Sequence, residues 1–225
     1  REAMETGVHR KIETHRLEQE MQMREKISEA RREREAELEK QLKEERKSLE
    51  KEMKARGMKA TFRATGQTGI FIAGDGVSVD AVVADFISGA TEFLSPANDP
   101  DHWDLVEGQG SLFHASYAGV SMGLIHGAQP DALVLCHEPT RKHMRGLPEY
   151  PIPNLKECLN ANEQAARLTN PKATCIGVSI NTKDLSDAER DSYLKRVEDE
   201  LGLPTVDPVT TGVSKLVDNL PVTNS

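Results

Sequence analysis

The sequence has few of the residues that mark disulfide-rich, zinc-binding or membrane proteins. Its 225 residues include three cysteines, and aromatic residues make up 4% of the total. The cysteines show no CxxC spacing, and an odd count without a framework favours a reducing, cytosolic setting. Cys136 and His137 are adjacent and would point opposite ways on a strand, so no zinc site is indicated. No run approaches the ~18 apolar residues of a transmembrane helix, so we expect no membrane segment.

Two familiar catalytic sites are not indicated. Ser111 lacks the nucleophile-elbow pattern G-x-S-x-G. Gly119 and Gly123 flank Ser121 with that spacing, but they lie within an expected helix and not at a strand-to-helix turn. The phosphate loop G-x-x-x-x-G-K-[ST] does not occur either. Gly69 and Gly74 have its glycine spacing, but Asp75 stands where the lysine belongs and would repel a phosphate. The sequence therefore offers no self-contained phosphate site.

Charge is distributed unevenly along the chain. The formal net charge is −8, yet residues 1–59 carry +2 and residues 60–225 carry −10. Phosphate backbones repel an acidic surface, so we expect no nucleic-acid partner for the second part.

Residues 1–48 differ in kind from the rest. No glycine or proline lies between Gly7 and Gly57, and glutamate alternates with lysine and arginine. An uninterrupted helix over this stretch would reach ~73 Å at 1.5 Å per residue. Its apolar positions drift and do not give three or four clean heptads. We predict a charged single helix over 1–48, with a weak coiled coil that makes a homo-oligomer, or a nucleic-acid-binding arm, as alternatives.

Residues 49–225 alternate strand-like and helix-like runs, after a helix that Gly57 ends. This order predicts an α/β domain with an open, mostly parallel sheet, a Rossmann-like three-layer sandwich. The expected strands are residues 60–65, 103–108, 131–138, 173–182 and 204–208. The expected helices are residues 78–94, 116–128, 154–169, 185–203 and 211–220. Ser78 is an expected N-cap, and Ser186 with Glu189 forms an expected capping box.

Polar and glycine-rich residues follow each expected strand. In an open parallel sheet, ligands bind outside the carboxyl ends of the strands, so these residues are expected to meet at one edge. The residues that follow the first strand and that we expect in a ligand site are Thr65, Gly66, Gln67 and Thr68. Those after the second, third and fourth strands are Glu107, Gly108, Gln109, Gly110, Ser111, His137, Glu138, Arg141 and Asn181.

Three side chains have the chemistry for catalysis or for holding an anion. Glu107 could hold Mg²⁺ or accept a proton, although a carboxylate at a strand end can also simply cap backbone amides. The imidazole of His137 could act as a base near neutral pH. The planar guanidinium of Arg141 suits a carboxylate or a phosphate. His114 is more typical of a packing histidine.

Three stretches carry a resemblance to a known family. They are RATGQTGIFIAGDGVSVDAVVADFISGA, VEGQGSLFHASYAGVSMGLIHGAQPDALVLCHEPTR and GVSINT. Over residues 49–220 the chain closely resembles the bacterial and archaeal D-glutamate N-acetyltransferases, a family long labelled as a domain of unknown function with a P-loop-like fold. The resemblance implies acetyl transfer from acetyl-CoA to the amine of D-glutamate.

The resemblance also assigns roles to residues. It implies that Arg63 or Arg141 grips a substrate carboxylate and that Glu107 or His137 takes the amine proton. The E-G-Q-G turn at Glu107 resembles that of dethiobiotin synthetase, where the carboxylate helps to bind metal, so Mg²⁺ is a further candidate. By the same likeness, Asn181 would contact a nucleotide base. A Mg-nucleotide-dependent kinase or ligase and an inactive α/β module on a helical scaffold are the alternative functions.

One part of the family pattern is missing. Relatives carry a strand and a glycine-rich phosphate loop ending in Gly-Lys just before the helix that here begins near Leu49, and a further N-terminal domain before that. Here the charged segment stands in that place. We therefore expect half of a site for an anionic cofactor, low activity, and a sheet that lacks a central strand and exposes apolar side chains.

Overall fold

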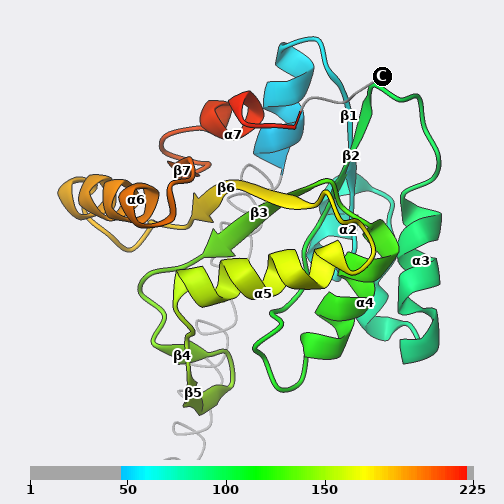
Figure 1. The fold of residues 1–225 in the computed structure, drawn as a ribbon, viewed down its shortest axis with the longest axis horizontal. Helices are drawn as coiled ribbons and strands as arrows, with labels where there is room; N and C mark the ends of the chain where they lie inside the picture. Colours follow the sequence, from blue (N-terminus) through cyan, green and yellow to red (C-terminus); the bar gives the residue numbers. More distant parts are fainter. Residues whose placement is uncertain (1–46, 222–225) are drawn as a thin grey trace, which may run out of the picture. The chain divides into compact units, whose positions relative to one another are not determined.

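The structure is a computed structural model of the chain, and it describes residues 47–221 (Figure 1). The charged helix predicted for residues 1–48 lies almost entirely outside the described residues, so it stays a prediction. Within residues 47–221, no helix is both long enough and apolar enough to cross a membrane.

The strands form two parallel sheets and one small hairpin. β1 (Lys59–Arg63) pairs with β2 (His102–Val106) in the first sheet. In the second sheet, β6 (Thr174–Ile180) lies between β3 (Ala132–His137) and β7 (Thr205–Val206). The antiparallel hairpin comprises β4 (His143–Met144) and β5 (Leu147–Pro151). Among the described residues no backbone ladder joins the two parallel sheets.

Helices connect the strands, as expected for parallel pairs. Residues 47–55 form the first described helix. It is followed by α2 (Gln67–Ala73), two 3-10 turns η1 (Val79–Ala81) and η2 (Ala84–Phe86), α3 (Ile87–Leu94), α4 (Ala118–Ala128), α5 (Leu155–Arg167), α6 (Asp187–Leu201) and α7 (Ser214–Asp218). The mostly parallel α/β fold predicted from the sequence is confirmed.

The helix of residues 47–55 packs on parts of both parallel sheets. Met53 is fully buried with Ala60 of β1, next to Trp103 and Leu105 of β2. Leu49 contacts this cluster and also the one formed by Val206, Val213 and Leu216, which β3 joins through Val134. Side-chain packing on this helix and on α7 therefore holds the two sheets together.

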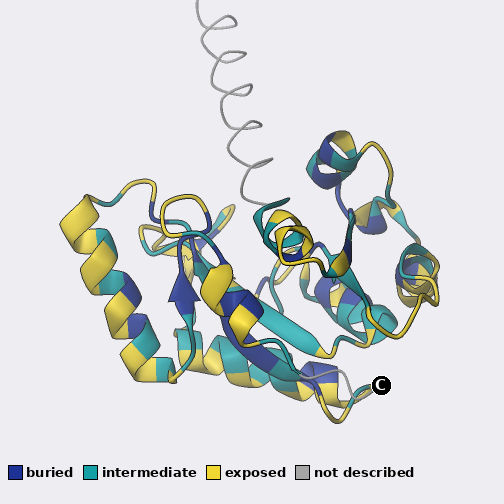
Figure 2. Cartoon of the chain, turned by 90° about the horizontal axis from the view of Figure 1, so that it is seen from above, coloured by how far each residue is buried: buried dark blue, intermediate teal, exposed yellow. Residues whose placement is uncertain are grey.

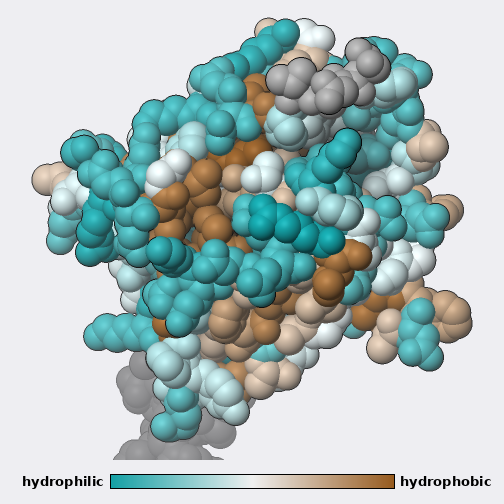
Figure 3. Space-filling model, viewed as in Figure 1, coloured by the Kyte–Doolittle hydropathy of each residue, from teal (hydrophilic) through white to brown (hydrophobic). Residues whose placement is uncertain are grey.

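Burial differs between the strands of the second sheet. Val178 and Ile180 of β6 are fully buried, together with Leu194 and Val197 of α6. Figure 2 shows α6 with one buried and one exposed face. In contrast, the apolar residues of β3 are only half-buried, and Figure 3 shows a band of apolar atoms on this side of the molecule, over β3 and β6. β3 is an edge strand of this sheet, which accounts for its partial burial.

The single helix predicted for residues 78–94 is wrong. Only Ile87–Leu94 is α-helical, because Val82 and Val83 adopt extended backbone angles that interrupt it. Two adjacent β-branched side chains are stiff and fit extended backbone better than helix. Ser78 stands at the N-cap position of the 3-10 turn η1, but its hydroxyl donates to Asp80 Oδ1 at 2.7 Å and makes no capping hydrogen bond to a backbone N–H.

Other local predictions are confirmed. Glu189 Oε2 accepts hydrogen bonds from the backbone N–H and the hydroxyl of Ser186, which is the predicted capping box of α6. Gly57 follows the first described helix with φ +79°, a left-handed angle that glycine adopts without strain. α2 and the β4–β5 hairpin are not among the helices and strands predicted from the sequence.

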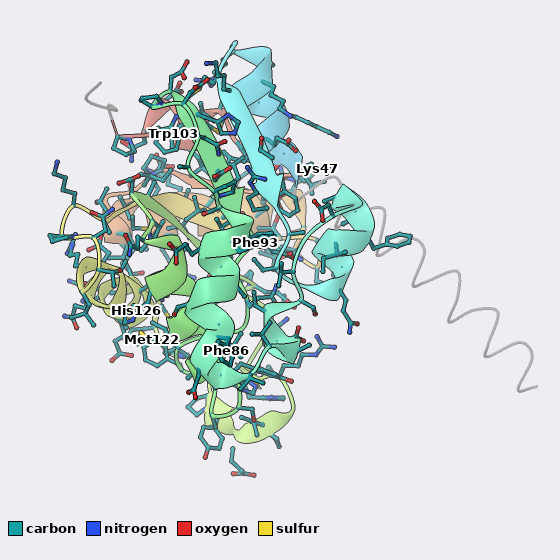
Figure 4. The ribbon with its side chains drawn as sticks, turned by 90° about the vertical axis from the view of Figure 1, so that its right-hand side faces the viewer. Lys47, Phe86, Phe93, Trp103, Met122 and His126 are labelled. Carbon is teal, nitrogen blue, oxygen red and sulfur yellow. The ribbon has the colours of Figure 1, made fainter. Side chains whose placement is uncertain are left out.

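Phenylalanines are exposed on the side of the molecule that carries α2 and α3. Phe86 and Phe93 lie along α3 and its leading turn and are 66% and 80% exposed, and both are labelled in Figure 4. Phe71 of α2 is 73% exposed.

Candidate functional site

Glu107 is held by the loop that leaves the neighbouring strand. It follows β2, is 7% exposed, and its Oε2 accepts hydrogen bonds from the backbone N–H of Thr65 at 2.9 Å and of Gly66 at 3.2 Å. Glu107 therefore does bind backbone amides, as one of the two interpretations of this residue expected. The amides belong to the β1–α2 loop, not to the helix that follows Glu107.

A chain of hydrogen bonds fixes the residues around Glu107. The Thr65 hydroxyl donates to the Glu107 carbonyl oxygen at 2.7 Å and accepts from Gln109 Nε2 at 3.0 Å. The hydroxyl of Ser121, on α4, donates to the Gln109 carbonyl oxygen at 2.6 Å. Hence β1, the β2–α4 loop and α4 are tied together at this point, and the Glu107 side chain has a defined direction.

Glycine is required at two places in this arrangement. A Cβ built on Gly69 of α2 would lie 2.0 Å from Glu107 Oε2, so only glycine leaves room for the carboxylate. Gly110 has φ +49°, and a Cβ there would lie 2.7 Å from Cβ of Tyr117. These glycines let α2 and α4 approach Glu107 closely.

A small cavity opens beside Glu107. Its volume is about 170 Å³. It is lined by Gly66, Gln67, Thr68, Asp80, Glu107 and Gln109. Five of the six were proposed from the sequence as site residues. The sixth, Asp80, was not, because Asp75, Asp80 and Asp85 share no helical face; the irregular segment around η1 brings Asp80 alone to the cavity.

Of the other site residues proposed from the sequence, His137, Glu138, Arg141 and Asn181 form a second group. At the ends of β3 and β6, the Asn181 backbone N–H donates to the His137 carbonyl oxygen at 2.9 Å. The Asn181 side-chain oxygen accepts from the Lys183 backbone N–H at 3.2 Å. Arg141 pairs with Glu138 three residues before it. None of these residues lines the cavity at Glu107.

His137 is engaged by a tyrosine. Its Nε2 lies 3.0 Å from the Tyr193 hydroxyl, and the two rings stack with their centroids 6.2 Å apart. Burial lowers the pKa of His137, and Arg141 adds to this effect against the opposing charge of Glu138. The neutral imidazole, the form that a base requires, is therefore favoured. Because Nε2 is bonded to Tyr193, however, the contacts of His137 in this structure are those of a packing residue.

Asp207, which directly follows β7, is a buried carboxylate. Its Oδ2 accepts hydrogen bonds from the backbone N–H and the hydroxyl of Thr182, and its Oδ1 accepts from the N–H of Val209 at 2.9 Å and of Thr210 at 3.1 Å. Burial alone would raise the pKa of Asp207, but these hydrogen bonds outweigh it and lower the pKa. Asp207 thus fastens the end of β7 to the end of β6.

Several predicted binding residues are committed to other contacts. Arg63 Nε donates to Asp104 Oδ1 at 2.8 Å, in a pair that is mostly buried. The Ser111 hydroxyl accepts from the Phe113 backbone N–H at 3.2 Å, and Gly108 is exposed. None of the three lines the cavity at Glu107.

His114 has the packing role that the sequence favoured for it. Its Nδ1 accepts from the Ser116 N–H at 3.1 Å, so Nε2 carries the hydrogen and donates to the Arg145 carbonyl oxygen at 3.0 Å. The buried imidazole joins the β2–α4 loop to the β4–β5 hairpin.

A larger hollow, of about 530 Å³, lies between α6, β7 and α7. Four of its five charged side chains pair with one another, Lys215 with Glu198 and Lys195 with Asp199. Size alone therefore does not mark the ligand site, and the cavity at Glu107 has the better-defined chemistry.

Comparison with known proteins identifies the family. A family model described as "Domain of unknown function (DUF1611_C) P-loop domain" matches residues 46–217. The chain belongs to the DUF1611 family. A crystal structure of a DUF1611 family protein from Anabaena variabilis is similar at a TM-score of 0.72 and 35% sequence identity, over 79% of this chain and 53% of that one. The described domain therefore has the P-loop domain fold.

Two curated relatives have names that state an activity. A D-glutamate N-acetyltransferase of Tritonibacter scottomollicae is 59% identical over 168 residues, which are 75% of this chain and 50% of that protein. A D-glutamate N-acetyltransferase of a Pseudoalteromonas species is 50% identical over 168 residues, 75% of this chain and 51% of that protein. The chain thus spans about half the length of the curated relatives it matches.

The DUF1611 domain offers oxygen ligands for Mg²⁺, but few of them. In residues 47–221, no three histidine, cysteine, aspartate or glutamate side chains converge as a metal site. The cavity supplies two carboxylates, Asp80 and Glu107, and the Thr68 hydroxyl. Mg²⁺ is commonly bound through one or two carboxylates with waters and ligand phosphates. These residues fit Mg²⁺ only when other oxygens complete its coordination.

Proposed function

We propose that this chain is the C-terminal part of an N-acetyltransferase that transfers acetyl from acetyl-CoA to the amine of D-glutamate. The proposal is supported by the names of two relatives that are 59% and 50% identical to it. The observation that carries it is the placement of Glu107, a buried carboxylate with a defined direction beside a small polar cavity. A carboxylate in this position can take a proton from a substrate amine.

The reaction requires an unprotonated amine. The ammonium group of D-glutamate gives one proton to a base, and the nitrogen then attacks the thioester carbon of acetyl-CoA. The C–S bond breaks, and the second proton lost by the nitrogen passes to the leaving sulfur, so the products are the N-acetyl amino acid, the CoA thiol and one proton. The protein contributes mainly by holding the amine near the thioester.

Glu107 is a better candidate for this base than His137. Glu107 lines the cavity, whereas His137 is bonded to Tyr193 and does not line it. We expect Glu107→Gln to lower kcat by about 10²-fold, the usual contribution of a general base. His137→Asn is the matched comparison and should change kcat much less. Thiol release with acetyl-CoA and D-glutamate measures both, and a larger loss in His137→Asn would assign the base to His137 instead.

The activity of this chain is proposed to be low. Residues 1–225 contain no G-x-x-x-x-G-K-[ST] loop, whose amides and lysine would bind the phosphates of CoA. The amides of Thr65 and Gly66 cannot replace that loop, because they already bind Glu107. Thiol release at an ordinary enzymatic rate by the full chain would contradict this proposal. Adding a strand and such a loop before Leu49 should increase the affinity for acetyl-CoA.

The P-loop domain fold supports a second candidate, a Mg-nucleotide-dependent kinase or ligase. Asp80 and Glu107 would then hold the metal ion, which would neutralise phosphate charge. Mg²⁺-dependent ATP binding without thiol release would favour this function. A cooperatively folded chain with neither activity would favour the third candidate, an inactive α/β module on a helical scaffold.

A further inference from the structure

The cavity at Glu107 has the wrong charge for the anionic end of a ligand. Among residues 47–221, the ionisable side chains that line it are the carboxylates of Asp80 and Glu107, and the other lining residues are glycine, threonine and glutamine. Two carboxylates at one small cavity repel a phosphate or a carboxylate and attract a cation. A cationic group is thus the chemistry that this cavity favours.

Two backbone donors beside the cavity are already used by one of its own carboxylates. Glu107 Oε2 accepts from the N–H groups of Thr65 and Gly66. Arg63, the nearest arginine in sequence, is bonded to Asp104 and does not line the cavity. An anionic group placed here would meet negative charge without these donors.

The remaining groups suit an ammonium ion. Besides the carboxylates, the Thr68 hydroxyl and the side-chain oxygens of Gln67 and Gln109 can accept hydrogen bonds, and an ammonium group has three N–H donors. A volume of about 170 Å³ is several times the ~30 Å³ share of one water molecule, so an amine and its neighbouring carbons fit. Glu107 is buried and Asp80 is exposed, which places one carboxylate deep and one at the entrance.

We propose that this cavity binds the amine end of the amino-acid substrate, and that Asp80 is a specificity residue that selects a protonated amine. The inference rests on the proposed acetyltransferase function and deepens it. The substrate carboxylates lie outside the cavity, and the amine is delivered to Glu107 for deprotonation. Asp80 contacts the ammonium group and takes no proton from it.

Binding by the full chain tests the role of Asp80. Calorimetric titrations would compare D-glutamate with glutarate, which keeps both carboxylates and lacks the amine. We expect D-glutamate to bind more tightly than glutarate, and Asp80→Asn to weaken D-glutamate binding roughly tenfold, the usual worth of a hydrogen bond to a charged group. Glutarate binding should not change in Asp80→Asn. Asp85→Asn is the matched control, an exposed aspartate five residues away that does not line the cavity.

Each contrary outcome identifies a different error. If glutarate binds as tightly as D-glutamate, or if Asp80→Asn weakens both ligands equally, the proposal is wrong. If Mg²⁺ alone binds, Asp80→Asn abolishes that binding and the amine makes no difference, the cavity is a metal site and the proposal is also wrong. A fourth outcome separates the two proposals. If binding selects the amine and depends on Asp80, but the chain releases no thiol even after a phosphate loop is added, the cavity assignment is upheld and the acetyltransferase function is rejected.

Discussion

Glu107 and Asp207 make a direct comparison between the two parallel sheets. Each is a buried carboxylate that directly follows a parallel strand, and each accepts backbone N–H groups from the loop after the neighbouring strand. Asp207 binds the neighbouring loop through Oδ2 and its own loop, at Val209 and Thr210, through Oδ1, and it lines neither described cavity. Glu107 binds the neighbouring loop through Oε2 and also lines a cavity. The same local device therefore fixes a strand end in one sheet and directs a side chain at a ligand site in the other.

The comparison predicts that Asp207 supports stability and that Glu107 supports ligand chemistry. Asp207→Ala should have the largest effect on stability, about 3 kcal/mol, because it removes a buried charged acceptor and leaves the buried donors of Thr182 and the N–H groups of Val209 and Thr210 without that acceptor. Urea unfolding followed by circular dichroism measures it. Asp199→Ala is the control, since its exposed pair with Lys195 should contribute at most about 0.5 kcal/mol. If the two variants lowered the free energy of unfolding equally, Asp207 would not have the structural role described.

Gly69→Ala tests how closely α2 approaches Glu107. The added Cβ would lie 2.0 Å from Oε2, so the helix or the carboxylate must move, at a cost of about 2 kcal/mol. Gly89→Ala on α3 has open space around its Cβ, and should stabilise the domain by about 0.5 kcal/mol. Thermal unfolding of the two variants should therefore shift in opposite directions. A stabilised Gly69→Ala would mean that Glu107 is not held as described.

Tyr193→Phe examines the second sheet at His137. Removing the hydroxyl deletes one hydrogen bond to His137 and should cost about 1 kcal/mol, while the stacked ring remains. Tyr150→Phe, at a half-exposed tyrosine, is the control and should have almost no effect. If Tyr193→Phe lowered thiol release strongly with little loss of stability, His137 would belong to the active site and the contrast between the sheets would fail.

The smallest predicted effect is the dependence of the Asp207 contribution on pH. The pKa of Asp207 is lowered in the folded state, so its charged form stabilises the fold above the unfolded pKa of about 3.9, and this stabilisation is lost as the pH falls through the lower folded pKa. The difference in free energy of unfolding between the wild type and Asp207→Asn should therefore be constant near neutral pH and shrink below about pH 4. A constant difference down to pH 2 would show that the charge does not matter.

Much of the fold could be predicted from local pattern. The apolar runs at β3 and β6 and the capping box of α6 are signals within a few residues, and the structure confirms them. The helix of residues 78–94 could not be predicted correctly, because the apolar spacing was helical while Val82 and Val83 favoured extended backbone. Periodicity and local stiffness disagreed there, and only tertiary contacts decide such cases.

The residues of the candidate site that follow strands could be predicted from the sequence. The contribution of Asp80 and the pairing of Arg63 with Asp104 could not. Glu107, Gln67 and Gln109 follow strands, so topology alone places them at one edge. Asp80 comes from an irregular connection, whose path depends on packing that no sequence period reports. The commitment of Arg63 to Asp104 was likewise hidden, since it depends on the register of β1 with β2.

The separation of the two parallel sheets has a mechanical consequence. Within residues 47–221 they share no backbone ladder, and the helix of residues 47–55 joins them through side-chain contacts of Leu49 and Met53. Packed side chains can slide by small steps, whereas a ladder can move only by breaking hydrogen bonds. A change by shear in the spacing between the edge that carries Glu107 and the edge that carries Asn181 would therefore leave each strand pair intact.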